Sequence, residues 1–273
     1  MADLPTLRGL SGGRLPTLDR PAPSAQVLPL DAALDVAGTP QSGTGQAALL
    51  TGASAAEIHG GHFGPWTPSG LRQLVAERSV LRNVVEAGGT AAFANAYPRD
   101  WPGPRGSRSI AGPPLAAQGA GLLNRHEESL ARGDAVASEI VNDGWRRHLG
   151  YAQLPDVSPV QAGANLARIA EGHDLTLYAH YSTDRAGHRG GMAGAVAALE
   201  LVDAFLRGLL ETLDPSVLLL IASDHGNIED VRTGHTRNPV FGLAVGDRAP
   251  EAHDLRDLRD VAPFILNFLG TSG

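Results

Sequence analysis

The chain has 273 residues, of which 42% are apolar and 19% charged, and its net charge is −7 at pH 7. A chain of this length forms one large domain, or one domain with an insertion. It has no cysteine, and all 22 basic residues are arginine, which excludes disulfide scaffolds, zinc–thiolate sites and lysine-based catalysis. The acidic balance argues against a nucleic-acid partner. Because no apolar run approaches the roughly 20 residues of a membrane helix, we expect a cytoplasmic protein without a membrane partner.

The first third of the chain contains two predicted strands, a glycine-rich loop and a long predicted helix. Ala25 to Leu30 is typical of a short strand. Gly38 to Gly45 is a turn-rich loop, which Gln46 to Leu50 continues as the start of a helix. Apolar residues at helical spacing from Leu71 to Ala87 predict a helix that ends before two glycines. Thr90 to Tyr97 then has the composition of a strand.

The middle of the chain combines a long loop with a broken helical segment. Pro98 to Pro114 is a loop rich in proline, glycine and arginine, and Ala116 to Leu149 is predicted to be helical in two pieces that break near Gly133. We therefore predict that residues 98–157 form a small cap-like insertion. Residues 1–97 and 158–273 then form the core domain.

The last part of the chain alternates between predicted helices and strands. The predicted helices are Ser158 to Gly172, Gly191 to Leu213 and Leu255 to Leu269, and the predicted strands are Leu175 to Tyr181, Val217 to Ala222 and Val240 to Val245. The apolar run from Val217 is typical of a buried parallel strand. This alternation indicates an α/β fold with a mostly parallel sheet, in which functional sites lie at the C-terminal ends of strands.

The most informative motif is Asp224-His225-Gly226-Asn227, directly after one of the predicted strands. It places an anionic oxygen and an imidazole at the sheet edge, and the glycine allows a sharp turn there. His235 follows ten residues after His225, shortly before the next strand. A strand end with surface histidines is the alternative explanation of this motif.

A second cluster, Asp184 and His188, follows the strand Leu175 to Tyr181. Residues four apart lie on one face of a helical turn, so both side chains can reach one ion. A carboxylate oxygen with an imidazole nitrogen suits zinc or manganese better than calcium. A solvated helix start is the alternative explanation of this pair.

A third cluster is the glycine-flanked Ser42 and Thr44, near the start of the first predicted helix. A helix N-terminus offers backbone donors and partial positive charge to a phosphate. Ser42 has no base beside it in sequence, but a metal ion can replace a base by lowering the pKa of the hydroxyl. Ser42 is the favoured nucleophile, and Thr44 is the alternative.

Together these motifs resemble the metalloenzyme core shared by cofactor-independent phosphoglycerate mutase, phosphopentomutase, alkaline phosphatase and sulfatases. Asp184 with His188, the segment Asp224 to Asn227, and His235-Thr-Arg-Asn-Pro-Val resemble the mutase motifs in order and spacing. Ser42 lies ten residues before Gly52, where this superfamily places its nucleophile. The resemblance runs from about Pro40 to the C-terminus, apart from the cap-like insertion.

The resemblance implies a three-layer α/β/α sandwich with two divalent metal ions, Mn or Zn. Asp184, His188 and His235 would hold one ion, and Asp224, His225 and the Ser42 oxygen the other. The family pattern also has an Asp-Gly at the end of a first strand, and this sequence has no Asp-Gly before Ser42. The family's first metal-ligand strand is therefore expected to be absent, with Asp31 and Asp35 as the nearest possible substitutes.

The resemblance also implies metal-dependent phosphoryl transfer on a phosphorylated small molecule. We expect a phosphomonoester hydrolase that acts through a phosphoserine. The alternatives are a phosphosugar mutase, a sulfate-ester hydrolase and a degenerate, non-catalytic member of the superfamily. Arginines 99, 105 and 108 either clamp an anionic substrate or belong to a solvated loop, and His59 and His62 either touch substrate or are ordinary loop residues.

Overall fold

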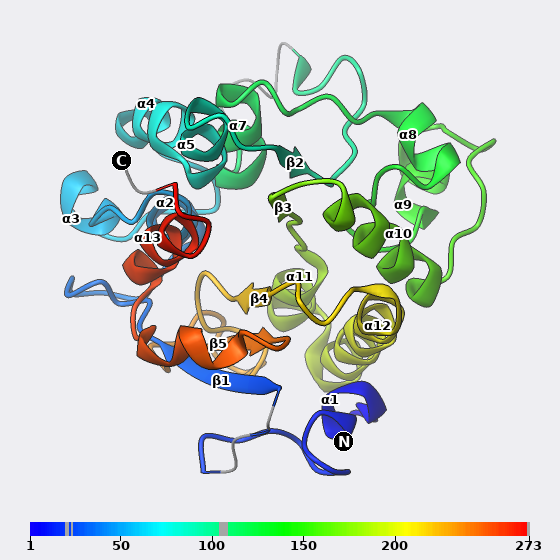
Figure 1. Ribbon diagram of the computed structural model, residues 1–273. Helices are drawn as coiled ribbons and strands as arrows, with labels where there is room; N and C mark the ends of the chain where they lie inside the picture. The colour runs from blue at the N-terminus through cyan, green and yellow to red at the C-terminus, as the bar shows by residue number, and fades with distance from the viewer. Residues whose placement is uncertain (20–21, 23, 104–108, 272–273) are drawn as a thin grey trace.

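The computed structural model describes residues 1–19, 22, 24–103 and 109–271, and over these residues the chain has an α/β fold (Figure 1). The strands are β1 (Ala25–Leu30), β2 (Ala91–Phe93), β3 (Leu175–Leu177), β4 (Leu219–Ala222) and β5 (Val240–Val245). The predicted strands at Ala25 to Leu30 and Val240 to Val245 are confirmed with their bounds. The other described strands are shorter than predicted.

Helices account for most of the remaining regular structure. In the first half of the chain they are α1 (Pro5–Gly9), α2 (Ser42–Thr51), α3 (Ala55–His59), α4 (Ser69–Arg78), α5 (Val80–Glu86), α7 (Gly112–Gly119) and α8 (Glu127–Arg132). In the second half they are α9 (Asp143–His148), α10 (Pro159–Glu171), α11 (Ser182–Arg189), α12 (Gly191–Thr212), the 3₁₀ helix η1 (Ala249–Asp254) and α13 (Leu258–Phe268). Among the described residues, no helix has the length and apolarity to cross a membrane.

The strand pairing corrects the prediction of a mostly parallel sheet. Strand β5 pairs antiparallel with β1 on one side and with β4 on the other, whereas β2 and β3 form a separate parallel pair. The physical reason lies in the connections. Parallel neighbours need a crossover, usually a helix, and the stretch between β4 and β5 contains only loop, so β5 returns antiparallel.

Helices cover both sides of the strands. Figure 1 shows α2, α4, α5, α7 and α13 on one side and α10 with α12 on the other. The first group shares a core with the strands that includes the fully buried Leu71 and Phe93. The second group packs through Leu166 and Phe205. The predicted α/β class is therefore confirmed.

Strands β3 and β4 are less buried than β2 and β5. Every residue of both strands is half-buried, whereas β2 is buried throughout and β5 is buried except at Phe241. Among the described strands, β3 pairs only with β2, and β4 only with β5. Figure 1 shows β3 and β4 on opposite sides of a central gap in the strands. The predicted buried strand at Val217 to Ala222 is therefore half-buried, because one of its edges has no described partner.

Ser79 divides the single helix that was predicted from Leu71 to Ala87. Its ψ angle of 152° is extended, and its side chain accepts a hydrogen bond from the Arg82 backbone N–H at 3.4 Å. Serine in this position ends α4 and caps α5, because the hydroxyl satisfies one of the free N–H groups at the start of the new helix.

Helix α2 begins at Ser42, before the predicted start at Gln46. The predicted loop to Gly45 is therefore partly helical. Its two glycines allow close packing, since a Cβ atom on Gly43 would clash with the Trp66 carbonyl oxygen and one on Gly45 with the Asp224 carbonyl oxygen. These tertiary contacts decide the conformation, although glycine disfavours helices by itself.

The region between Ala116 and Leu149 contains three helices instead of the predicted two. The predicted break at Gly133 is confirmed, since Gly133 ends α8 with a φ of 77°. Helix α7 packs into the main core, whereas α8 and α9 form a separate small cluster around Leu130 and Trp145. The division of the chain at 98–157 stays a prediction.

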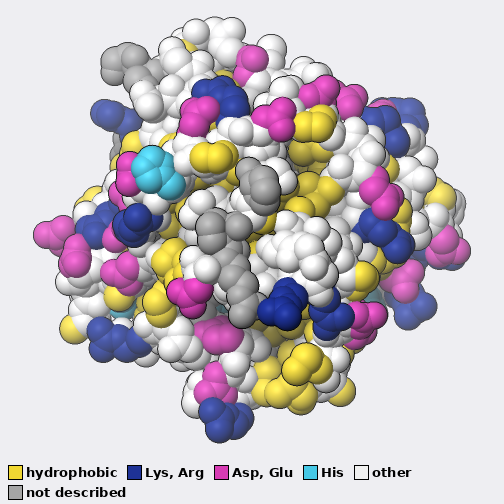
Figure 2. Space-filling view, turned by 60° about the horizontal axis from the view of Figure 1, so that its bottom comes forward, with side chains coloured by type: hydrophobic (Ala, Val, Ile, Leu, Met, Phe, Trp, Pro, Cys, Tyr) yellow, Lys and Arg dark blue, Asp and Glu magenta, His cyan; other side chains and the backbone are white. Residues whose placement is uncertain are grey.

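Charged side chains of both signs are intermingled on the face of the molecule in Figure 2. Some form ion pairs with sequence neighbours, such as Arg8 with Asp3 at 3.0 Å and Arg248 with Glu251 at 2.6 Å. Exposed pairs of this kind contribute little to stability. The stability of the fold therefore depends mainly on its apolar core.

A pair of substitutions on β5 tests this view. Leu243 is fully buried and Phe241 is 47% exposed. Leu243→Ala should lower the free energy of unfolding by about 2–5 kcal/mol, because it leaves a cavity in the core. The matched control Phe241→Ala should cost less than about 1 kcal/mol. Urea unfolding followed by circular dichroism measures both, and equal losses would show that the strand is placed wrongly.

Candidate metal centre

The first predicted pair is brought together by helix α11. Asp184 lies in its first turn and His188 in its last, so the spacing of four places both on one face of the helix. His188 Nε2 lies 3.4 Å from Asp184 Oδ1. Both side chains remain about 40% exposed, so solvent reaches them.

A short backbone bridge brings His225 and His235 together. Gly226 pairs with Thr236, whose N–H donates to the Gly226 carbonyl at 3.0 Å. This bridge closes the loop between β4 and β5. As a result, the rings of His225 and His235 stack with their centroids 3.8 Å apart.

The carboxylate of Asp184 lies at the centre of this histidine cluster. Its Oδ1 is 3.4 Å from His188 Nε2, 3.7 Å from His225 Nε2 and 3.6 Å from His235 Nε2. One ligand atom from each of Asp184, His188 and His235 lies within 4.8 Å of the others. A carboxylate and two imidazoles in this arrangement match the ligand set of a divalent transition metal.

The orientation of His235 also fits metal binding. Its Nδ1 lies 2.9 Å from the Pro40 carbonyl oxygen. Because a carbonyl only accepts, Nδ1 carries the proton and Nε2 of the neutral ring has a free lone pair. Such a hydrogen bond to the outer ring nitrogen is the usual way in which proteins orient a metal-binding histidine. His235 Nε2 and His188 Nε2 face each other at 2.9 Å.

The electrostatics of the cluster favour the charged forms of Asp184 and His235. Burial raises the pKa of Asp184, but hydrogen bonds with His235 and Asn227 and the charges of His225 and His188 lower the pKa overall. Burial lowers the pKa of His235, but its contacts with Asp184 and Pro40 raise the pKa overall. Asp184 is therefore an ionised carboxylate at neutral pH, as a metal ligand must be.

Asp224 and His225 follow β4, at the boundary between the cluster and helix α2. Asp224 Oδ1 lies 3.7 Å from His225 Nε2, and Oδ2 accepts a hydrogen bond from Gln46 Nε2 at 2.8 Å. Gln46 Oε1 in turn accepts from the Gly112 N–H at 2.9 Å. The sequence analysis missed Gln46 as a site residue, although its position one turn after Ser42 was the available signal.

Ser42 and Thr44 occupy different environments. The Ser42 hydroxyl lies 2.9 Å from His225 Nε2 and so faces the cluster. The Thr44 hydroxyl donates to the Gln41 carbonyl at 3.2 Å and accepts from the Phe63 N–H at 3.3 Å. Thr44 is fully buried, and its hydroxyl is occupied by backbone groups. Of the two candidates, the structure brings Ser42 to the cluster of aspartate and histidine side chains.

Asn227, the last residue of the Asp-His-Gly-Asn motif, positions Asp184. It is 3% exposed, and its Nδ2 donates to the Asp184 backbone carbonyl at 3.2 Å and to the Asp184 carboxylate at 2.5 Å. Gly187 lies directly against it, and a Cβ there would clash with Asn227 Oδ1. The motif therefore ties the loop after β4 to helix α11.

Glu229 holds the loop between β4 and β5 in shape. It accepts hydrogen bonds from the Asn227 N–H at 2.7 Å, from the Thr236 hydroxyl, and from Asn238 Nδ2 at 3.2 Å. Burial raises the pKa of Glu229, but these bonds lower it overall. Nothing in the sequence reasoning singled out Glu229, because its partners lie up to nine residues away.

Other residues considered from the sequence lie in different surroundings. Asp35 pairs with Arg259 at 2.7 Å, and Asp31 accepts a hydrogen bond from the Ala33 N–H. Arg99 pairs with Glu128 at 2.8 Å and is exposed. Arginines 105 and 108 lie outside the described residues. Asp31 and Asp35, which were considered as substitute ligands, therefore lie outside the cluster of Asp184, His188 and His235.

The C-terminal part of the chain matches a known family. Residues 154–273 match the family described as Metalloenzyme superfamily, so the resemblance stated from the sequence is confirmed over this segment. The segment contains Asp184, His188, Asp224, His225 and His235. Ser42 lies outside it. Metal binding by the Asp and His cluster is therefore supported by both geometry and family.

The similar curated proteins are described as 2,3-bisphosphoglycerate-independent phosphoglycerate mutases. The one from Roseobacter denitrificans is 36% identical over 132 residues, and the one from Paracoccus denitrificans is 35% identical over 132 residues. Each match covers 44% of this chain and 26% of the relative, so the matched part is about a quarter of those proteins. Among solved structures, the PH0037 protein from Pyrococcus horikoshii has a TM-score of 0.45 and 16% identity, covering 70% of this chain and 45% of that chain.

Removing one ligand tests the metal centre. Asp184→Asn keeps the size of the side chain but removes the charge that balances a dication, so affinity for Mn or Zn should fall by about a hundredfold or more. Isothermal titration with each metal measures the affinity. His253→Ala, which removes an exposed histidine, is the control and should bind metal like the wild type. Equal affinity of wild type and Asp184→Asn would contradict the assignment.

Proposed function

We propose that this chain is a divalent-metal-dependent phosphoryl-transfer enzyme, and that it hydrolyses phosphomonoesters with Ser42 as the nucleophile. The observation that carries the proposal is the 2.9 Å contact between Ser42 Oγ and His225 Nε2. This contact places a hydroxyl at a helix start directly beside the cluster of Asp184, His188 and His235. A nucleophile and a metal-ligand set side by side are the parts that this chemistry needs.

The start of helix α2 supports phosphate binding. Ser42 is its first residue, and Gln41 before it makes no side-chain capping bond to the helix. The first N–H groups of a helix have no partner within the helix. In α2 the Thr44 N–H donates to the Phe63 carbonyl at 3.0 Å, which leaves the N–H groups of Ser42 and Gly43. Their partial positive charge favours a phosphate, so an ester bound there would have its phosphorus next to the Ser42 hydroxyl.

The ligand residues divide into two groups. Asp184, His188 and His235 would hold one ion, and Asp224 and His225 with Ser42 would hold a second, with Zn or Mn as the metals that suit these ligands. When bound, such ions neutralise phosphate charge and lower the pKa of a hydroxyl. Asn227 and Gln46 orient the two carboxylates for this role.

The reaction has two half-steps. In the first, a bond forms between Ser42 Oγ and phosphorus as the bond from phosphorus to the alcohol oxygen breaks; the Ser42 proton passes to solvent, and the departing oxygen takes up a proton. In the second, water attacks the phosphoserine, releases inorganic phosphate and restores the Ser42 hydroxyl. One water molecule is consumed for each ester.

A phosphosugar or phosphoglycerate mutase is the second candidate, because the similar curated proteins are described as phosphoglycerate mutases. The two reactions share the first half-step and differ only in the acceptor of the phosphoryl group. In both cases we propose a three-layer α/β/α core with residues 98–157 as a small cap-like insertion.

Substitution of Ser42 tests the proposal. Ser42→Ala should lower the rate of p-nitrophenyl phosphate hydrolysis, in the presence of Mn or Zn, by at least about a thousandfold, or about 4 kcal/mol of barrier. Ser69→Ala removes an exposed serine from the start of α4 and is the matched control, with wild-type rates expected. A phosphorylated Ser42 peptide should be found by mass spectrometry after a rapid acid quench.

Two results would contradict the assignment. Near-normal hydrolysis by Ser42→Ala together with loss of activity in Thr44→Ala would make Thr44 the nucleophile. Transfer of phosphate to an added sugar or glycerate phosphate, in preference to water, would identify a mutase instead of a hydrolase.

A further inference from the structure

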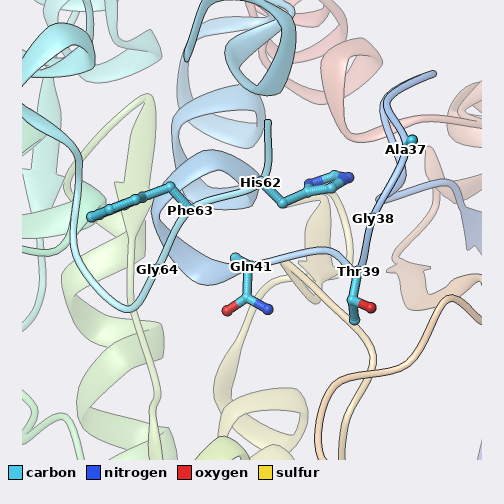
Figure 3. Close-up of a pocket in the computed structure, with 7 residues that line it drawn as sticks. All are labelled: Ala37, Gly38, Thr39, Gln41, His62, Phe63 and Gly64. Atoms are coloured by element: carbon cyan, nitrogen blue, oxygen red, sulfur yellow. The ribbon is translucent and has the colours of Figure 1, made fainter. Parts of the chain in front are cut away.

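Among the described strands, β3 and β4 each pair on one edge and leave the other edge open, on opposite sides of the same gap (Figure 1). We infer that this gap, called here the strand gap, binds one extended apolar segment of a partner polypeptide through main-chain hydrogen bonds. The inference is independent of the reaction proposed for Ser42. The cavity of about 420 Å³ between segments 37–41 and 62–64 (Figure 3) is a different feature, since none of its lining residues comes from β3 or β4.

The hydrogen bonds of β3 show which backbone groups lie on its open edge. The Leu175 N–H donates to the Thr90 carbonyl at 3.1 Å, and the Leu177 carbonyl accepts from the Ala94 N–H at 2.9 Å. Successive residues of a strand direct their backbone groups to opposite edges. The N–H and C=O groups of Thr176 therefore point away from β2, towards the strand gap.

Strand β4 has the same pattern on its side of the gap. The Ser223 N–H donates to the Phe241 carbonyl of β5 at 3.0 Å, and this register continues through β4. Bonded and non-bonded positions alternate in an antiparallel pair, so Ile221 bonds to β5 while the backbone groups of Leu220 and Ala222 point away from it. Free N–H and C=O groups along a strand edge are a template for another strand.

Helices cover both faces of the two strands. Leu177 and Leu220 pack on the core cluster of α2 and α4, whereas Ile221 and Tyr178, which directly follows β3, pack on the cluster of α10 and α12. Every residue of β3 and β4 is nevertheless half-buried, so the remaining exposure lies at the open edges, between the two helix layers. A segment in the strand gap would be covered on both faces and must therefore be apolar on both.

The strand gap also separates the two segments that carry the histidine cluster. Asp184 follows β3 and His225 follows β4, and Asp184 Oδ1 lies 3.7 Å from His225 Nε2. The carboxyl ends of β3 and β4 therefore lie at the same end of the gap. A segment bonded to both strands would join them along their length and hold these two side chains in place.

The chain itself does not supply the missing strand. The described strands already have their places in the two sheets. Residues 20–21, 23, 104–108 and 272–273, which lie outside the described structure, contain no valine, leucine or isoleucine. The occupant is therefore a segment from outside these 273 residues. Its expected chemistry is a run of about six apolar residues rich in valine and isoleucine, the length and composition of an ordinary buried strand.

A model peptide tests the strand gap. The probe is a soluble peptide of about six alternating valine and isoleucine residues between arginine tails. Its control carries N-methyl groups on alternate residues, which removes the N–H donors of one edge and keeps every side chain. Fluorescence polarisation with the full chain should show binding of the probe, and at least about tenfold weaker binding of the methylated peptide, because each main-chain hydrogen bond contributes about 1 kcal/mol.

Amide exchange measured by NMR locates the bound probe. Exchange at the open-edge amides of Thr176, Leu220 and Ala222 should slow by at least about tenfold when the probe is added, because a bonded N–H is protected from solvent. The amides of Leu175 and Ile221, which already bond to β2 and β5, are the internal controls and should change little.

Three results would overturn the inference. The first is equal binding of the two peptides, or binding of neither. The second is binding of the probe without protection of the open-edge amides. The third is a dimer that forms without peptide and protects the same amides, which would assign the strand gap to a second copy of the chain. Neither peptide contains phosphate, so failure here leaves the proposed reaction at Ser42 unaffected, and loss of that reaction leaves the strand gap unaffected.

Discussion

The arrangement of the site depends on one carboxylate oxygen. Asp184 Oδ1 lies within 3.7 Å of imidazole nitrogens from His188, His225 and His235, which come from two separate segments of the chain. A buried or half-buried carboxylate must be compensated by hydrogen bonds or positive charge. The segments that carry these histidines are therefore held together by the same interaction that prepares the site for a cation. The loop between β4 and β5 and helix α11 form one unit for this reason.

Close backbone packing makes this unit possible. Gly187 lies against Asn227, Gly45 against the Asp224 carbonyl, and Gly226 against Thr236. Any side chain at these positions would clash with a neighbour, so the ligand loops could not approach each other or helix α2. The glycines weaken the local secondary structure. The hydrogen bonds of Asn227, Gln46 and Glu229 compensate by fixing the loops from outside the cluster.

The sequence predicted those site residues that follow a strand or whose partners are close in the chain. Asp184 and His188 are one helical turn apart, and the helix predicted from Ser158 to Gly172 is found at Pro159–Glu171, where Ser158 caps it by accepting from the Gln161 N–H. The misses have long-range causes. The direction of β5, the half-burial of β4 and the early start of α2 are decided by which segments meet in space, and periodicity carries no such information. Gln46 was missed for the same reason, since its partner Asp224 is 178 residues away.

In the proposed function, charge would couple metal binding to phosphate binding. A phosphomonoester near Ser42 would bring negative charge towards Asp184 and Asp224, which face imidazoles and the Gln46 amide. The partial charge of a helix N-terminus, about half of one unit, is too small to balance two carboxylates and a phosphate. Divalent ions held by these residues would balance them, and a phosphate could supply further oxygen ligands. Under the proposed function, each partner would therefore raise the affinity for the other, as linkage requires.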